Sequence, residues 1–552
     1  MLGAYLLLAV ATCILLAEYH GWRGMPLLDD NMQYFFIAER VSEGVPPYVS
    51  QFEPKNALCV ILTGGAIRLG ELFGVDAVTA SRLLSLAILA GLGAMTMIFV
   101  HSLTGRSTAA VAAGAVLFSF SSLIQMGIMG SRPKVFLIFF MMATLLAFRR
   151  ERIFLSGFLG GCCFLCWQPG LLVPAVLGFL VLFGRWTGER TLLERGLAYA
   201  SGGALSALLY LGYFLLQGML GEAGSLQTGL DLLTLHWHQS YVFPSEYLTG
   251  GAGFPGFAAA WKKLVETWEW GFSEKAAVSG WQVRHLNWMP LLAAAGAIRY
   301  VCHLLGFWKL PEFTHPRGPA WWAFLGLLVP VLAFTFIEHQ GAPDLFFMLP
   351  FLAVLAGLLV HFLASDFSRP EAPGMGRILG AIGCLLVVLG SSYLAGQPSG
   401  LLYNRGDEIA ENIARQAGSV SVNVEGDSAQ KAYGRLPFLL ADQKIAATRI
   451  DEWHAQGDTI ASVGSTHLLG MADLSNWDSY GLFYRGVDAY VRDAHETQAY
   501  RPDLVRGTLP QRVLLSRRAP EKAETWTSLY QEVENDVFNR QGIRVLELKP
   551  VP

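Results

Sequence analysis

The sequence predicts a mainly α-helical, polytopic membrane protein with a C-terminal α/β domain. The 552 residues are 53% hydrophobic and only 15% charged, with a mean hydropathy of +0.40, a balance that is unusual for a soluble protein. The charged residues are unevenly spread, because 38 of the 83 lie in the last 156 positions. We therefore expect a transmembrane module over 1–396 and a water-facing domain over 397–552.

Segments of about 20 apolar residues are long enough to cross a bilayer as helices. The sequence contains about eleven such segments, at 2–19, 77–102, 108–126, 134–148, 154–168, 170–184, 196–217, 286–306, 319–337, 345–364 and 376–396. Arginine is concentrated in the short loops at 149–152 and 185–195, which the positive-inside rule assigns to the cytoplasm. The segment 20–76, the long loop 218–285 and the C-terminal domain are then expected on the opposite side.

Net charge and cysteine content indicate which partners and cross-links the sequence does not favour. A net charge of −3 provides no basic field for nucleic acid, so we expect no nucleic-acid partner. The seven cysteines lie in or beside apolar segments and imply no disulfide framework. Cys162, Cys163 and Cys166 are interpreted as packing residues.

His236 and His238 have a spacing that could place two imidazoles on one side of a strand as metal ligands, but no carboxylate follows them closely.

The segment 20–76 carries the charged groups with the clearest pattern. Asp29 and Asp30 stand at the head of an amphipathic stretch, Asn31 to Glu43, which is expected to form a helix lying in the membrane interface. A turn at 44–47 leads to Lys55 and to a second apolar piece, 56–73, which is also expected to be interfacial. This arrangement brings carboxylates and an ammonium to the membrane surface.

The C-terminal domain shows alternating helix and strand patterns. Strands are expected at 420–424, 459–463, 512–516 and 543–548, and helices at 407–417 and 524–538. The domain contains no glycine-rich phosphate loop and no nucleophile elbow. We therefore expect it to recognise an acceptor or a partner rather than to carry the chemistry.

Three stretches of this sequence resemble the GT-C membrane glycosyltransferases that use polyprenyl-phosphate sugars, including the protein O-mannosyltransferase and aminoarabinose-transferase groups. The run from Asp30 to Tyr34, with Pro47 and Tyr48 beyond it, resembles the acidic motif of the family, although Asn31 stands where many members have Glu. The run 52–56 resembles the Lys-Pro-Pro segment, and 72–83 resembles its continuation into the second span. The late segment 346–357 is similar more weakly.

The resemblance implies a cell-envelope transferase in the inner (plasma) membrane of a bacterium that moves a sugar from a lipid-phosphate donor to a glycan, lipid or protein acceptor. Asp30 would act as the general base, with Asp29 as the alternative. Donor-phosphate binding would fall to Lys55, Arg132, Lys134 and Arg82. Tyr34, Tyr48, Glu338 and His339 would support the site. No cofactor is firmly implied, and a divalent metal stays open.

Other interpretations of the same residues remain. Asp29 and Asp30 could cap the N-terminus of their helix, and Arg132 and Lys134 could meet lipid headgroups. The altered acidic motif also fits a non-catalytic membrane assembly or receptor protein that retains the scaffold. A lipid or solute transporter is disfavoured, because few ionisable residues fall within the predicted spans.

Overall fold

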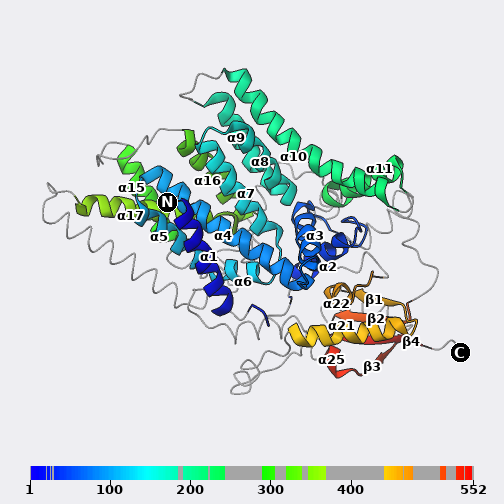
Figure 1. Cartoon of the computed structure of the whole chain (residues 1–552). Coiled ribbons are helices and arrows are strands. Elements are labelled where there is room, and N and C mark those ends of the chain that lie inside the picture. The colour runs from blue at the N-terminus through cyan, green and yellow to red at the C-terminus, as the bar shows by residue number, and fades with distance from the viewer. Residues whose placement is uncertain are drawn as a thin grey trace, which may run out of the picture.

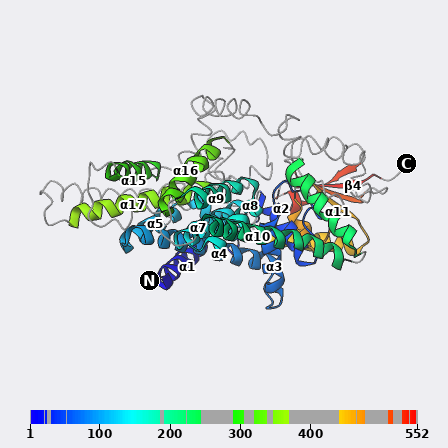
Figure 2. The same cartoon turned by 90° about the horizontal axis from the view of Figure 1, so that it is seen from above.

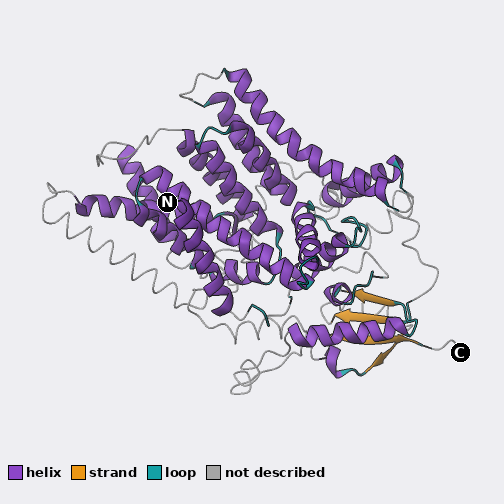
Figure 3. Ribbon diagram, viewed as in Figure 1, coloured by secondary structure: helices purple, strands orange, loops and turns teal. Residues whose placement is uncertain are grey.

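A computed structural model provides the structure of the chain. It describes residues 2–19, 22–24, 27, 30–51, 53–184, 191–221, 224–242, 289–304, 319–337, 346–368, 440–463, 465–476, 510–516, 530–539, 541 and 543–549. Most of these residues are helical, and the strands lie together near the C-terminus (Figure 3).

The helices up to residue 368 form one packed body (Figure 1). They are α1 (Leu2–Tyr19), α2 (Asp30–Ser42), α3 (Leu58–Glu71), α4 (Ala77–Thr104), α5 (Ser107–Phe118), α6 (Ser121–Ile128), α7 (Pro133–Arg149), α8 (Ile153–Cys166), η1 (Gln168–Leu171), α9 (Leu172–Phe183), α10 (Leu192–Leu220), α11 (Leu226–Trp237), η2 (His238–Val242), α15 (Met289–Leu304), α16 (Pro319–Ile337) and α17 (Leu349–Ser368).

Two of these helices, α4 and α10, are long and apolar enough to cross a membrane by length and composition. Six further apolar helices are shorter, within α1, α5, α8, η1–α9, α16 and α17. Large apolar side chains point outward on α1, α9 and α10, including Leu7, Phe183 and Leu220 at 70% exposure or more. Such contiguous apolar surface is suited to lipid rather than to water.

The helices agree with ten of the eleven predicted spans in position, and the eleventh, 376–396, lies outside the described residues. The segment 108–126 differs from the prediction, because it is broken between α5 and α6. The Ser119 hydroxyl donates to the carbonyl of Val116, which competes with continued helical hydrogen bonding. Of the predicted loop 218–285, the described part forms α11 and η2.

Small residues allow α8 and α10 to approach closely. A Cβ atom at Gly202 would lie 2.0 Å from the carbonyl oxygen of Phe154, and one at Gly157 would lie 2.1 Å from that of Tyr199. The two backbones are therefore in direct contact at reciprocal positions, as in membrane helix pairs with small residues at the interface. This contact fixes α10 against the body that contains α7 and α8.

Helix α2 is more buried than the sequence predicted. It packs between α3 on one side and α22 (His467–Met471) on the other. Tyr34, Ile37 and Val41 contact the α3 side, whereas Phe36 belongs to the core of the C-terminal elements. The sequence of α2 has the pattern of an amphipathic helix. Its polar residues, such as Asn31 and Gln33, are nevertheless buried and hydrogen-bonded within the protein.

The C-terminal elements form a four-stranded sheet in the order β1-β2-β4-β3. The strands are β1 (Ile460–Val463), β2 (Arg512–Ser516), β3 (Tyr530–Val533) and β4 (Ile543–Leu548), with helices α21 (Leu440–Ala455), α22 and α25 (Asp536–Asn539). Strand β1 is parallel to β2, and the other pairs are antiparallel. Figures 1 and 2 place this sheet at the end of the molecule where α2, α3 and α11 lie.

The three described strands that the sequence predicted are confirmed as β1, β2 and β4. The predicted helix over 524–538 is wrong at 530–533, because these residues pair with β4 as strand β3. Tyr530 is buried there and Gln531 and Glu532 are exposed, so pairing with β4 outweighs the helical spacing of the charged residues. The expected helix at 407–417 and strand at 420–424 lie outside the described residues.

Hydrogen bonds join the sheet elements to the first part of the chain. The Gln443 amide on α21 accepts from the backbone N–H of Leu27 at 2.9 Å and donates to its carbonyl at 3.0 Å. The Leu440 N–H donates to the carbonyl of Gly24, and Lys444 lies 3.8 Å from Asp76. We refer to the described residues 440–549 as the C-terminal unit, which these contacts hold beside α2.

The glycine contact between α8 and α10 gives a stability prediction. Gly202→Ala should lower the midpoint of thermal unfolding in detergent, because the methyl group overlaps the Phe154 carbonyl and overpacking of this kind costs about 1 to 3 kcal/mol. Gly212→Ala is the matched control on the same helix, since nothing lies within 4 Å of its Cβ position. Equal midpoints for the two variants would contradict the close contact.

Candidate functional site

The loop between α2 and α3, residues 44–57, carries the charged residues of interest without regular structure. It begins at Gly44, whose φ of +93° is readily adopted only by glycine. It continues through Tyr48, which also has a positive φ of 71°. A non-glycine residue in this region is strained, so tertiary contacts must hold Tyr48 in place.

Other helices supply those contacts. The Gln239 amide accepts from the N–H of Glu53 at 3.0 Å and donates to the carbonyl of Tyr48 at 3.2 Å. The Gln168 amide donates to the carbonyl of Pro54 at 2.7 Å, and the Tyr210 hydroxyl accepts from the N–H of Ala57 at 2.8 Å. Side chains from η1, α10 and η2 thus fix the loop at four backbone positions.

A buried network surrounds the Tyr48 hydroxyl, which donates to the carbonyl of Lys55 at 2.8 Å. Ser240 lies 3.2 Å from that hydroxyl and 3.2 Å from Nδ1 of His236. Burial lowers the pKa of His236 to about 4, so this imidazole is neutral at physiological pH. His236 lies in the last turn of α11 and His238 begins η2. Because residues two apart on a helix do not face each other, the two imidazoles do not form the metal pair considered from their spacing.

Glu53 is the buried carboxyl group of the loop. It accepts hydrogen bonds from Nε2 of Gln33 at 2.5 Å and from the backbone N–H of Lys55 at 2.9 Å. Burial raises the pKa of Glu53 to about 7, Asp30 acts in the same direction, and the Lys55 ammonium and N–H oppose them. Glu53 is therefore a carboxyl group that can exchange a proton near neutral pH.

Lys55 lies against Tyr34 of helix α2. Its ammonium donates a hydrogen bond to the Tyr34 hydroxyl and lies 5.1 Å from the centre of the ring. Burial raises the pKa of the Tyr34 phenol, and the charges of Glu53 and Asp30 add to this effect while Arg132 opposes it. These electrostatic interactions show that Asp30, Glu53, Lys55 and Arg132 surround one buried phenol.

Asp30 is the first residue of α2, and it is exposed. A carboxylate in the first turn of a helix is stabilised by the positive end of the helix dipole. Because Asp30 also interacts electrostatically with both Tyr34 and Glu53, it lies on the same side of the helix as the loop. This position combines solvent access with closeness to Lys55.

Arg132 is buried at the start of α7, and its Nε donates to the Oδ1 atom of Asn31. The preceding Gly130 has a φ of +135° and packs beside Ser81 and Asn31. The short connection between α6 and α7 therefore reaches the N-terminal end of α2. Asn31 stands where the acidic motif that this stretch resembles often has Glu. Here its side chain accepts a hydrogen bond from an arginine.

The two remaining basic residues have separate surroundings. Lys134 lies 4.8 Å from the centre of the Trp167 ring, next to Gln168, which binds the loop at Pro54. Arg82 is buried on α4 and donates to the carbonyl of Trp22. The structure thus brings Lys134 toward the loop and directs Arg82 to the segment that follows α1. Asp29, Glu338 and His339 lie outside the described residues.

The arrangement can hold an anion beside a carboxylate. Lys55 and Arg132 provide two positive charges near the start of α2, against Asp30 and a Glu53 that is partly protonated at neutral pH, whereas Lys134 lies against Trp167. Ammonium and guanidinium groups form strong, charge-assisted hydrogen bonds with phosphate. A phosphorylated ligand would therefore lie within reach of a solvent-accessible carboxylate.

The sequence interpretation assigned no role to Glu53, Gln33 or Gln239. Glu53 lies inside the quoted run 52–56, so its place next to Lys55 was visible, but its burial was not. Gln239 comes from a segment 186 residues further along the chain. Nothing in the local pattern of an amide side chain indicates that it holds a distant loop.

Comparison with solved structures identifies the fold. ArnT from Cupriavidus metallidurans bound to undecaprenyl phosphate superposes with a TM-score of 0.53 at 15% identity, covering 98% of both chains. Its apo structure gives the same score and identity, covering 99% of this chain and 98% of ArnT. This chain has the GT-C fold. The resemblance found in the sequence is confirmed at the level of the GT-C fold.

A third GT-C structure, the oligosaccharyltransferase of Archaeoglobus fulgidus, gives a TM-score of 0.45 at 14% identity and covers 78% of this chain and 57% of its own. No protein-family model and no curated sequence matches the chain. The likeness to ArnT extends over nearly the whole of both chains. It is visible in the fold and not in the overall sequence.

The raised pKa of Glu53 gives a prediction about stability and pH. An unfolded carboxyl group titrates near 4.5, whereas Glu53 in the folded protein has a pKa of about 7. The folded state binds the proton more tightly, so the contribution of Glu53 is present at low pH and is lost as the pH rises from about 4.5 to about 7. In Glu53→Gln, the thermal midpoint should therefore fall less steeply across this range than in the unmodified protein.

The control for this prediction is Glu452→Gln, which removes an exposed carboxylate from α21. Thermal unfolding in detergent at several pH values measures both variants. If the two pH profiles have the same slope, burial of Glu53 does not perturb its proton affinity as described.

Proposed function

We propose that the chain is a membrane glycosyltransferase that moves a sugar from a polyprenyl-phosphate donor to an acceptor on the non-cytoplasmic side of the membrane. One grouping of charges carries this proposal. The Lys55 ammonium donates to the Tyr34 hydroxyl, and the charges of Asp30, Glu53 and Arg132 act on the same phenol. The fold shared with ArnT, whose structure was solved with undecaprenyl phosphate, supports the same donor class.

The reaction would begin with the acceptor. Its hydroxyl or amine attacks C1 of the sugar, the bond between C1 and the phosphate oxygen breaks, and the acceptor proton passes to the Asp30 carboxylate. Asp30 suits this role because it is exposed, and an acceptor can approach it from solvent. Asp29 remains the alternative base in this proposal.

The leaving group would be the lipid phosphate, which gains negative charge as the bond breaks. Lys55 and Arg132 would stabilise that charge, with Lys134 adding to the positive field. Arg132 and the loop of Lys55 are held in position by hydrogen bonds, so little reorganisation is needed during the reaction. Tyr34 and Tyr48 would support the site by positioning the Lys55 side chain and backbone.

A divalent metal stays open in this proposal. Among the described residues, the set of three side chains suited to bind an ion, Glu39, Glu43 and Asp473, does not include Asp30 or Glu53. The C-terminal unit packs on α2 next to the site, which is consistent with recognition of the acceptor.

The first prediction from this proposal concerns the base. Asp30→Asn should reduce sugar transfer by on the order of 10²- to 10⁴-fold, because the amide cannot accept the acceptor proton. Asp29→Asn should have a smaller effect. Asp231→Asn, which changes an exposed aspartate on α11, is the control and should retain full activity. Transfer by the purified variants measures this directly.

Two outcomes would change the assignment. Full activity of Asp30→Asn would remove Asp30 from the mechanism, whereas loss of activity confined to Asp29→Asn would move the base by one residue. Folding of each variant is checked by its elution profile and thermal midpoint in detergent.

The second prediction concerns the phosphate. Lys55→Ala should raise KM for the donor and lower kcat on the order of 10²-fold, because charge on the leaving phosphate is larger in the transition state than in the ground state. Lys55→Arg should restore part of the activity, since a guanidinium keeps the charge but has a wider geometry. Lys549→Ala, which removes an exposed lysine just after β4, should behave as the unmodified protein.

Unchanged donor binding and turnover in Lys55→Ala would shift phosphate recognition to Arg132, Lys134 or Arg82. The corresponding alanine variants would then be compared by the same measurement.

A further inference from the structure

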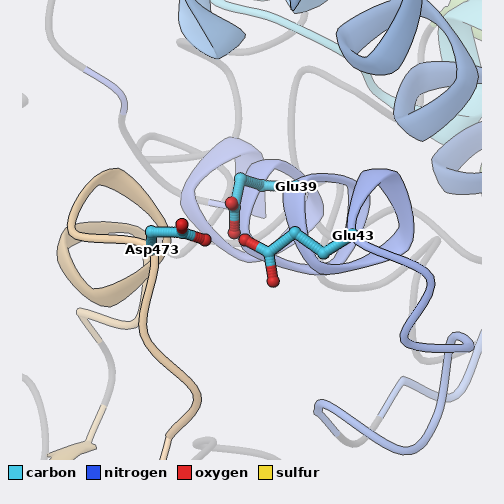
Figure 4. A group of neighbouring side chains, drawn as sticks. All are labelled: Glu39, Glu43 and Asp473. Atoms are coloured by element: carbon cyan, nitrogen blue, oxygen red, sulfur yellow. The ribbon is translucent and has the colours of Figure 1, made fainter.

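A second group of carboxylates lies where helix α2 meets the C-terminal unit. Glu39 lies in the last turn of α2, Glu43 comes one turn later, directly after the helix, and Asp473 follows α22 (Figure 4). The three carboxylates point toward one another, and one oxygen from each lies within 4.8 Å of the others. Carboxylates from two separate parts of the chain thus meet at one place.

Glu39 makes this group different from an ordinary acidic surface. Its side chain is buried, with 6% of the residue exposed, and its Oε2 atom has no hydrogen-bond partner among the described residues. Gly470 of α22 allows this approach, since a Cβ there would lie 3.3 Å from that oxygen. A buried carboxylate without a partner carries a large desolvation cost, so a compensating group is expected.

The surrounding charges do not supply full compensation. Arg40 binds Glu43 and lies 3.8 Å from Asp473, and its charge also acts on Glu39. Glu71 adds a further negative charge, and its own cationic partner is Arg68. Two arginines therefore face four carboxyl groups, and the Oε2 atom of Glu39 accepts a hydrogen bond from neither of them.

We propose that Glu39, Glu43 and Asp473 bind a divalent cation, Ca²⁺, which bridges α2 and the C-terminal unit. Hard cations of this kind prefer carboxylate oxygens. Oxygens spread over as much as 4.8 Å fit Ca²⁺, with bonds of about 2.3 to 2.6 Å, better than Mg²⁺, whose bonds of about 2.0 to 2.1 Å require closer ligands. The Asp473 side chain is 79% exposed, so water can complete the coordination.

The site is separate from the residues proposed to carry out sugar transfer. It lies toward the C-terminal end of α2, whereas Asp30 and Tyr34 lie in the first part of that helix. Binding would fasten the C-terminal unit to the helix that carries Asp30. The inference does not depend on the proposed function, because binding of the ion can be measured in the absence of any donor or acceptor.

The test uses the full-length protein in detergent, treated with a chelator and then dialysed. Calorimetric titration with CaCl₂ should give one site with a Kd of about 10⁻⁴ to 10⁻³ M, and about 10 mM Ca²⁺ should raise the thermal midpoint by a few degrees. Titration with MgCl₂ should show weaker binding. A shared proton between Glu39 and Asp473 is the competing explanation, and it predicts no response to Ca²⁺.

Variants locate the binding. Glu39→Gln and Asp473→Asn should each weaken Ca²⁺ binding at least tenfold, and Asp473→Asn is exposed enough to leave the fold intact. Glu452→Gln, an exposed acid of α21 paired with Arg449, is the control and should bind as the unmodified protein. Absence of binding in the unmodified protein, equal affinity for Mg²⁺, or unchanged affinity in both cluster variants would overturn the proposal.

Discussion

The conformation of the loop 44–57 depends on hydrogen bonds from side chains far away in the sequence. The backbone of this loop has few internal partners, and buried backbone groups need partners. Gln168, Tyr210 and Gln239 supply them. The position of Lys55 against Tyr34, and with it the grouping of charges around α2, follows from these contacts. A loop held in this way keeps its side chains in fixed positions, which is the support that a functional site requires.

The two described acids near Lys55 have different environments. Asp30 is exposed at a helix N-terminus, whereas Glu53 is buried and has a pKa of about 7. Burial thus gives the loop one carboxyl group that changes its protonation near neutral pH, while Asp30 meets solvent. Asn31, next to Asp30, accepts a hydrogen bond from Arg132, so this arginine is fixed beside the first turn of α2.

Much of this organisation could be predicted from the sequence, because it depends on local patterns. Apolar length located helical structure at ten of the predicted segments, and alternation located three strands. The motif around Asp30 and Lys55 indicated the candidate site, whose role stays a prediction. The burial of α2 could not be predicted, because the C-terminal unit that covers it is about 400 residues away in sequence, and a polar face buried by protein has the same pattern as one facing water. For the same reason, strand β3 was taken for a helix, since only its pairing with β4 distinguishes the two.

The length of α10 also determines the depth of the loop. At about 1.5 Å per residue, Tyr210 lies about 27 Å along the axis from the first residue of the helix, Leu192. The hydrocarbon core of a bilayer is about 30 Å thick. Counted from position 196, where the predicted span begins, Tyr210 lies about 21 Å along the helix, well past its middle. The hydrogen bond from Tyr210 to Ala57 thus ties the depth of the loop to a fixed point on α10.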